Sequence, residues 1–478
     1  MRNANGSGHE QRRQTDGPGK DEVNRMNDFR KTAQEMLEFI RISPTCFHAV
    51  ANIGRMLEAA GFQQLQEKEE WKLEKGGRYY TERNDSSVIA FVIPEKEVGI
   101  RGFHMAAAHS DSPCFKIKEK PELTVEEHYL RLNTEKYGGM ILSTWLDRPL
   151  SVAGRLAVKN GNGIEGRLVN IDRDLCVIPN VAIHMNREMN KGVEYNPQVD
   201  LLPLLADVSF DEYDTHTTYD AQTASENAEE QPETVEKPTL AALAAEAAGV
   251  DAETILGEDL FLYTRQEGKM IGAKGEFVLS PRLDDLQSAF ALTKAFTEST
   301  PAEYINLCAV FDNEEVGSGT RQGADSTFLE DTLQRITEGL QEGHSTYLRW
   351  VADSFLISAD NAHAVHPNHP EKADPANRPY LNGGIVIKYH GGQKYTTDGI
   401  SAAKMKDYCE RAKVPYQTYA NRSDIAGGST LGNISTAHVS VSSVDIGLPQ
   451  LAMHSAVETA GMKDTEYAVR ALKEFWGE

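Results

Sequence analysis

The stretch INLCAVFDNEEVGSG, residues 305–319, joins a buried strand to an acidic turn. Residues 305–311 carry no charge, which is typical of a short strand covered on both faces of a sheet. Asp312, Glu314 and Glu315 follow directly. Because helical spacing of apolar residues precedes and follows this strand, the stretch indicates an α/β fold with a mainly parallel sheet covered by helices.

The alternation of helices and strands extends over most of the chain. Apolar residues recur at helical spacing in residues 286–297, before the strand, and in residues 326–340, after it. Apolar runs with few charges elsewhere predict further buried strands, because a strand buried on both faces has no side given over to charged residues. The other expected strands are 88–93, 103–108, 355–358, 384–389 and 439–446, and the other expected helices are 27–40, 47–60, 401–412 and 464–476.

A different pattern interrupts the α/β region between residues 119 and 269. Short strand-like runs, one of them residues 181–184 ending at His184, are separated by turn residues such as Asn160 and Gly161 and predict a β-rich insert. We therefore expect one α/β domain built from residues 26–118 and 270–478, with the insert between its two parts.

Composition and charge exclude several classes of protein. The net charge of −23 argues against binding to nucleic acid or to an anionic membrane. Much of this charge lies in the acidic, alanine-rich segment 207–256, which is expected to be a mobile loop with at most one short helix. Residues 1–25 are polar and are expected to form a disordered tail rather than a secretory signal. The apolar runs are too short for a membrane span and the cysteines form no C-x-x-C pair, so a cytoplasmic location is expected.

The uncharged run 103–108 ends at His109, and Ser110 and Asp111 follow. In parallel sheets, functional groups collect at the carboxyl ends of the strands. A histidine at such an end, with a carboxylate two residues on, suits a metal ligand whose ring is oriented by the acid. The alternative is a turn in which Asp111 caps the backbone, and these residues alone favour both interpretations equally.

The paired glutamates Glu314 and Glu315 are harder to explain as structural residues. Like charges clustered after a buried strand cost free energy unless a cation or a hydrogen-bond donor balances them. One glutamate could bind a metal ion while its neighbour acts as general base on a water molecule. A solvated acidic loop is the alternative.

Three further places offer ligands of the same type. Asp284 and Asp285 stand just before a helix, where one can be the N-cap and the other is free for another task. Asp360 follows an expected strand and begins the tract DNAHAVHPNHP, whose prolines prevent the histidines from sharing a helical face. His454 follows a short apolar run, although a lone histidine is more often structural than a ligand.

These residues are more specific together than any of them is alone. Histidines and carboxylates at the ends of elements suit zinc or a similar divalent ion, as a pair about 3.5–4 Å apart bridged by an aspartate. The sequence contains no H-E-x-x-H, C-x-x-C, G-x-S-x-G or P-loop motif, which excludes the common single-helix zinc site and two other catalytic classes.

Six regions of the chain match one known family in order, spacing and flanking residues. They are AHSDSP (108–113), YGG with STWLDRPLSVAGR (137–155), PRLDDL (281–286), DNEEVGS (312–318), SADNAHAVHPN (358–368) and QLAMHSAVE (450–458). In these regions the chain resembles the aspartyl aminopeptidase family of co-catalytic zinc peptidases, which includes the vacuolar aminopeptidase I type. The likeness runs from about residue 30 to the C-terminus.

The resemblance implies two divalent metal ions, Zn2+ or in its place Co2+ or Mn2+, and a role for each residue. The implied roles are one ion on His109 and Asp360, a second ion on Glu315 and His454, a bridge at Asp284, the general base at Glu314 and an orienting carboxylate at Asp111.

The resemblance also implies an assembly and a substrate. The β-rich insert would be a dimerisation domain, and the dimers would form a tetrahedral homododecamer. His184, in NVAIHMN, resembles a histidine that reaches the active site of a neighbouring subunit. A basic residue near residues 389–395 would meet an acidic side chain of the substrate, and Lys388 and Lys394 are the candidates.

The leading hypothesis is a zinc-dependent metalloaminopeptidase acting on peptides, with acidic N-terminal residues (Asp or Glu) preferred. A neutral, Leu-type preference is the alternative within the family. A co-catalytic zinc deacylase or carboxypeptidase could share the ligands, since fold analogy alone does not separate these enzymes. A shell-forming scaffold without catalysis is the non-enzymatic alternative, and the intact Glu314 counts against it.

Overall fold

The central sheet of the computed structural model combines strands from both parts of the chain that flank the insert. The structure describes residues 20–95, 99–208 and 239–478. The strands β13, β4, β14 and β18 lie side by side and parallel at the centre of this nine-stranded sheet. In spatial order the strands are β1 (Gln63–Gln64), β2 (Arg78–Arg83), β3 (Ser87–Val92), β13 (Ile305–Phe311), β4 (Phe103–His109), β14 (Phe355–Ala359), β18 (Ser442–Gly447), β16 (Ile385–Tyr389) and β17 (Tyr416–Ala420).

Helices cover both faces of this sheet, which explains why its central strands consist mostly of apolar residues. Alternate residues of β4 point to opposite faces, so Ala106 and Ala108 belong to one core, and Met105 and Ala107 belong to the other. The first face is covered by α1 (Lys20–Arg41), α2 (Cys46–Ala59), α5 (Leu283–Thr297), α8 (Gly399–Arg411) and α10 (Asp464–Trp476). The second is covered by α6 (Phe328–Gly339), α7 (His344–Ala352) and α9 (Leu431–His438).

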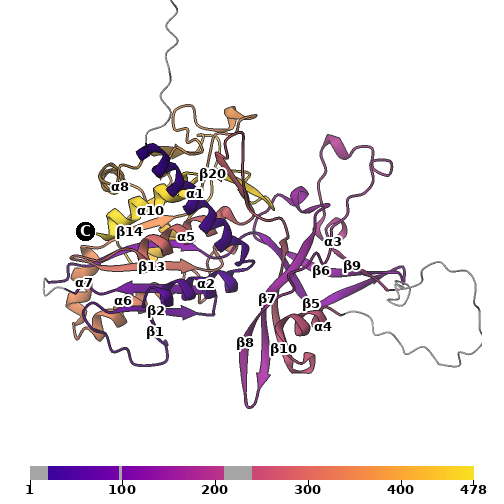
Figure 1. Ribbon diagram of the computed structural model, residues 1–478, viewed down its shortest axis with the longest axis horizontal. Helices are drawn as coiled ribbons and strands as arrows, with labels where there is room; N and C mark the ends of the chain where they lie inside the picture. Colours follow the sequence, from indigo (N-terminus) through magenta and orange to yellow (C-terminus); the bar gives the residue numbers. More distant parts are fainter. Residues whose placement is uncertain (1–19, 96–98, 209–238) are drawn as a thin grey trace, which may run out of the picture.

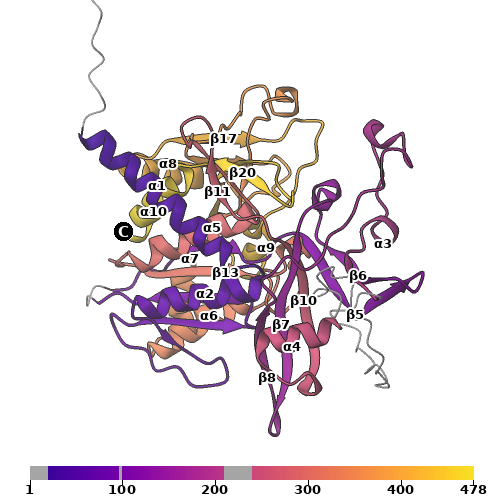
Figure 2. The ribbon, with the colours of Figure 1, turned by 45° about the vertical axis from the view of Figure 1, so that its right-hand side comes forward.

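A separate six-stranded antiparallel sheet stands beside the α/β body (Figures 1 and 2). Its strands are β8 (Gly163–Asn170), β7 (Leu150–Asn160), β10 (Ile255–Thr264), β5 (Cys114–Val125), β6 (Tyr129–Tyr137) and β9 (Leu204–Asp207). The short helices of this region are α3 (Pro197–Asp200) and α4 (Leu240–Ala248). The chain enters this sheet at Cys114, five residues after His109, and leaves it at Thr264, from which two short strands lead to α5.

A small third sheet of five strands accompanies the central sheet. It consists of β11 (Lys269–Ile271), β12 (Phe277–Ser280), β20 (Glu458–Gly461), β19 (Pro449–Leu451) and β15 (Ala362–His363). The turn between β19 and β20 carries His454, whose φ of +65° is in the left-handed region. No helix among the described residues is both long and apolar enough to cross a membrane.

Three expectations from the sequence need correction. Residues 20–25, expected in the tail, begin helix α1, and residues 1–19 lie outside the described part. Within the segment 207–256, expected to be a mobile loop with at most one short helix, residues 240–248 form that helix, α4, but it is packed rather than mobile, since it buries Leu240 in the core of the six-stranded sheet. Residues 209–238 of that segment lie outside the described part.

The third correction concerns the strand expected to end at His184. Residues 181–184 form a turn instead, and their side chains are exposed. A run of four residues is too short for its periodicity to distinguish a strand from an exposed loop.

Candidate metal centre and active site

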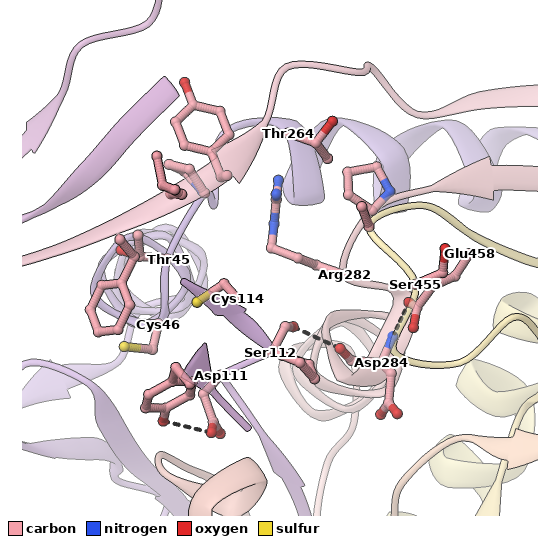
Figure 3. A pocket seen from close by; sticks show the side chains of 18 of the residues that line it. Thr45, Cys46, Asp111, Ser112, Cys114, Thr264, Arg282, Asp284, Ser455 and Glu458 are labelled. Carbon is pink, nitrogen blue, oxygen red and sulfur yellow. Dashed lines mark hydrogen bonds between the residues drawn. The ribbon is translucent and has the colours of Figure 1, made fainter. Parts of the chain in front are cut away.

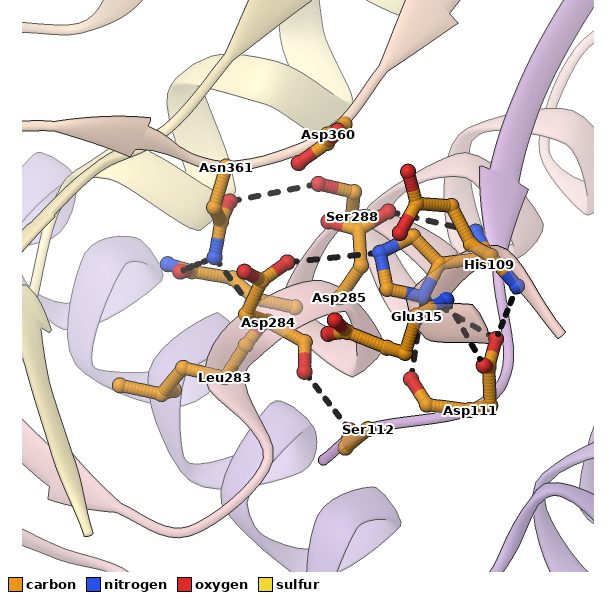
Figure 4. Close-up of polar contacts among 12 residues, drawn as sticks. His109, Asp111, Ser112, Leu283, Asp284, Asp285, Ser288, Glu315, Asp360 and Asn361 are labelled. Atoms are coloured by element: carbon orange, nitrogen blue, oxygen red, sulfur yellow. Dashed lines mark hydrogen bonds and ion pairs between the residues drawn. The ribbon is translucent and has the colours of Figure 1, made fainter. Parts of the chain in front are cut away.

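The expected ligands meet at the carboxyl edge of the central parallel strands, where the chain leaves each strand to form a loop. His109 is the last residue of β4, and Asp360 follows β14 directly. The other positions are Asp284 at the start of α5, Glu314 and Glu315 in a 3-10 helix (Glu314–Val316) just beyond β13, and His454 between β19 and β20. Figure 4 shows His109, Asp284, Glu315 and Asp360 turned toward one another.

Asp284 lies between the two histidines. Its Oδ1 is 3.4 Å from Nε2 of His109, and its Oδ2 is 3.4 Å from Nε2 of His454. The same His454 nitrogen is 3.4 Å from Oε1 of Glu315. Two sets of ligand-type atoms therefore share Asp284: one with His109, Asp285 and Asp360, the other with Glu315 and His454. The structure thus separates Asp284 from Asp285, which the sequence left equivalent as candidates for a bridge.

These residues fit a divalent metal. Ligand atoms about 2.0–2.1 Å from a tetrahedral zinc ion lie about 3.3–3.4 Å from one another, the spacing of these nitrogen and oxygen atoms. Among the described residues, Oδ1 of Asp284 and Oε1 of Glu315 are buried without a hydrogen-bond partner. Buried carboxylate oxygens of this kind cost free energy unless a cation balances them.

Asp111 joins His109 to the glutamate loop. Its Oδ1 accepts the backbone N–H of Glu314, and its Oδ2 accepts that of Glu315, both at 3.1 Å. The Nδ1 atom of His109 is 3.0 Å from the carbonyl oxygen of Asp111 and 3.4 Å from its Oδ1. Asp111 therefore caps the backbone of the glutamate loop with its carboxylate, and it also contacts the His109 ring.

Glu314 has the environment of a general base. Burial raises the pKa of its carboxyl to about 7, and the negative charges of Asp360, Asp111 and Asp284 act in the same direction against the opposing effect of His109. A carboxyl that titrates near neutral pH can both accept and return a proton, which general acid–base catalysis requires.

Glu458 and Asn361 are buried residues beside the site that were assigned no role in the sequence analysis. Glu458 accepts the backbone N–H of Asp284 at 3.0 Å and that of His454 at 2.7 Å. The side-chain nitrogen of Asn361 donates to the carbonyl oxygen of Leu283 at 2.9 Å. In the sequence, these two residues are marked only by lying in the same motifs as the expected ligands Asp360 and His454.

The two lysines considered for substrate recognition both interact with other groups of the protein. Lys388 is buried, with its Nζ 3.6 Å from Oδ1 of Asp360, so its charge compensates a carboxylate of the site. Lys394 donates from Nζ to the carbonyl oxygen of Gly427 at 3.1 Å.

His184 lies apart from the cluster of ligand-type residues. Its side chain is exposed on a loop of the insert, next to the exposed apolar side chains of Val181, Ile183 and Met185. It belongs to none of the groups of ligand-type residues found in the described part of the chain.

Two hollows border the site. One lies between the α/β body and the six-stranded sheet, where Cys46, Cys114 and Arg282 surround it and Asp111 and Asp284 reach its edge (Figure 3). Its free volume of about 40 Å³ has room only for water. The other is an open cleft of about 420 Å³, lined by parts of the segments 363–374, 419–427 and 450–452. Its lining residues His363 and Ala452 stand three residues after Asp360 and two residues before His454 in the chain, and its volume is large enough for a peptide terminus.

The comparison with known families agrees with this geometry. The family described as "Aminopeptidase I zinc metalloprotease (M18)" matches residues 39–476. The chain belongs to the M18 family of zinc aminopeptidases. This M18 aminopeptidase is therefore a metallopeptidase and a hydrolase, and the family and the α/β fold expected from the sequence are confirmed.

Relatives of this M18 aminopeptidase match it over nearly its whole length. A probable M18 family aminopeptidase 2 of Clostridium novyi is 46% identical over 448 residues, which cover 93% of this chain and 98% of the relative. The solved structure of the Ape4 and Nbr1 complex matches with a TM-score of 0.86 and 36% identity, over 95% of this chain and 86% of the other. The S. cerevisiae mApe1 dodecamer matches with a TM-score of 0.77 and 26% identity, over 94% and 97%.

Proposed function

We propose that this M18 aminopeptidase releases the N-terminal residue of peptides with the help of two divalent metal ions. Zinc is the expected metal, and cobalt or manganese could replace it. His109 and Asp360 would hold one ion, Glu315 and His454 would hold the other, and Asp284 would bridge them. The observation that best supports this arrangement is that the two oxygens of Asp284 face different histidines, each at 3.4 Å.

The residues around these ligands suggest how the reaction proceeds. When bound, the metal pair would act as a Lewis acid on the scissile carbonyl and lower the pKa of the attacking water. Glu314 would take the proton from that water and pass it to the leaving amine. Asp111 would keep Glu314 in place, because it accepts the N–H groups of Glu314 and Glu315 while its carbonyl oxygen contacts His109.

We propose the open cleft beside Asp360 as the place of the substrate's N-terminal residue, with acidic side chains preferred. Lys372, Arg422 and His366 line this cleft and give it basic groups. An acidic side chain would pair with Lys372 and would add to the existing pair of Arg422 with Asp424, whereas a neutral side chain would gain no charged contact there. A neutral preference remains the alternative that the assay below distinguishes.

We further propose that the six-stranded sheet mediates dimerisation and that the dimers form a homododecamer. The solved mApe1 dodecamer, a relative of similar fold, supports this assembly. His184 would then act in the neighbouring subunit's site, since it is exposed and outside the cluster of its own subunit. The five cysteines are all free thiols, which supports the proposed cytoplasmic location.

A panel of aminoacyl chromogenic substrates, assayed with and without a chelator, tests these proposals. We expect hydrolysis that is fastest for Asp and Glu, stops when the metal is removed and returns when zinc is added. Faster hydrolysis of Leu would replace the acidic preference by the neutral one. A metal-loaded protein that hydrolyses no substrate would favour the scaffold alternative.

A further inference from the structure

Tyr137 brings a hydroxyl group from the insert to the catalytic loops. It is the last residue of β6, and its hydroxyl donates to Oδ2 of Asp111 at 2.8 Å while accepting from Nδ2 of Asn313 at 2.8 Å. Its ring packs edge-on against Phe261 of the insert strand β10, with centroids 5.5 Å apart. The ring of Tyr137 is therefore anchored in the six-stranded sheet, while its hydroxyl group contacts the loops at the edge of the central sheet.

The hydroxyl completes the set of donors that hold Asp111. The two oxygens of this buried carboxylate accept the Tyr137 hydroxyl and the N–H groups of Glu314 and Glu315. A carboxylate held by donors from two directions cannot rotate without breaking one of these hydrogen bonds. The Tyr137 hydroxyl thereby fixes the residue whose carbonyl oxygen contacts Nδ1 of His109.

The backbone that follows β6 lies against the same loops. Gly138 has a φ of +78°, and a Cβ atom at this position would lie 3.0 Å from Cβ of Glu315. The N–H of Ile141 donates to the carbonyl oxygen of His454 at 3.0 Å. The end of β6 thus touches the loops that carry both expected ligands of one metal ion.

We propose that Tyr137 is a positioning residue through which the insert sets the geometry of the metal centre. The proposal rests on the site roles proposed above. Without the hydroxyl, Asp111 loses a donor and the side-chain nitrogen of Asn313 loses its acceptor, so the loop carrying Glu314 and Glu315 is held less firmly. Loss of such outer hydrogen bonds typically lowers metal affinity or activity about 10–100-fold.

The variant Tyr137→Phe tests the proposal, because it removes the hydroxyl and keeps the ring on Phe261. Zinc titration of the metal-free protein should show affinity lowered about 10-fold or more, and kcat at saturating zinc should fall with KM little changed. The matched control is Tyr263→Phe, which removes an insert hydroxyl that donates to Asn170, also at 2.8 Å, and should change neither quantity. Zinc affinity and kcat both equal to those of the wild type would overturn the proposal.

A double-mutant cycle separates positioning from a general loss of packing. If Tyr137 acts through Asp111, Tyr137→Phe should have no further effect on zinc affinity in an Asp111→Asn background, and additive effects would contradict the proposal. If Tyr137→Phe does not fold, Asn313→Asp keeps an acceptor for Thr320 and Gln322 and a residue that tolerates the φ of +61° there, while its new carboxylate oxygen competes with Asp111 for the Tyr137 hydroxyl. Unchanged zinc affinity and kcat in that variant would then overturn the proposal. Zinc titration is independent of catalysis, so failure of the proposed reaction would not be mistaken for failure of this inference.

Discussion

Glu458 accepts the backbone N–H of Asp284 at 3.0 Å, although 174 residues separate them in the sequence. Its second oxygen accepts the N–H of His454 at 2.7 Å. Both donors belong to proposed metal ligands, and both ligands face each other through Nε2 and Oδ2. One buried carboxylate outside the proposed ligand set therefore holds the backbone of two proposed ligands, Asp284 and His454.

Glu458→Gln should weaken metal binding while leaving the ligands themselves unchanged. A glutamine side chain has only one carbonyl oxygen, so its NH2 group would face one of the two N–H donors. We expect zinc affinity about 10–100-fold lower, measured by titration of the metal-free protein. Glu342→Gln, at an exposed position, is the control and should bind zinc like the wild type. Unchanged affinity in Glu458→Gln would show that the ligands are held by other contacts.

Glu314→Gln and Glu315→Gln should separate proton transfer from metal binding. The first keeps the shape of the side chain but removes the base, so we expect kcat lower by about 10²–10⁴-fold with both metal ions retained. The second replaces a proposed ligand, so it should lose metal, as elemental analysis after gel filtration would show. Near-normal turnover in Glu314→Gln would remove this residue from the role of general base.

His184→Ala should impair turnover without removing metal, because the proposed role of His184 is in the neighbouring subunit's site. Mixing it with Glu314→Gln under conditions of subunit exchange should recover activity, up to about a quarter of the wild-type value. Random exchange makes half of the dimers hybrid, and each hybrid dimer contains one intact composite site. Exchange verified by mass spectrometry without recovered activity would mean that His184 acts within its own subunit or is structural.

His104 should make the stability of the fold depend on pH. Its ring is buried between Tyr304 and Phe475, with centroid distances of 3.7 and 4.6 Å, and burial lowers its pKa from 6.5 to about 4. Because the folded protein favours the neutral ring, this contribution is complete above pH 6.5 and is lost as the pH falls toward 4. Glu478, Lys404 and Arg101 are the nearby charges that modify this shift.

His104→Phe should keep the stacked ring and remove the proton-binding group. Between about pH 7.5 and about pH 5 the wild type should lose about 2 kcal/mol of unfolding free energy more than this variant. Urea denaturation of both proteins at the two pH values measures the difference. Parallel losses in the two proteins would show that the ring is already able to take up a proton in the folded state.

The elements that decide the chemistry were those predicted best. The strand 305–311 has the expected bounds, and the strand ending at His109 and the terminal helix differ from expectation by at most one residue. These elements are buried on one or two faces, and burial requires apolar residues at regular positions, so their sequences carry a clear apolar pattern. The helix α7, the helix α9 and the edge strand β17 were missed, because half-exposed elements carry a weaker pattern.

The sequence alone determined which residues have ligand chemistry and that they stand at the ends of elements, because residue type and local periodicity are properties of short segments. Residue type and position left Asp284 and Asp285 equal candidates for the bridge between the metal ions, and they indicated no role for Tyr137 or Glu458. Only the tertiary structure decided that Asp284 faces both histidines and that Tyr137 and Glu458 hold the surrounding loops. The physical reason is that these contacts join segments far apart in the chain, and the directions of their side chains depend on how the two sheets pack together rather than on their neighbours in sequence.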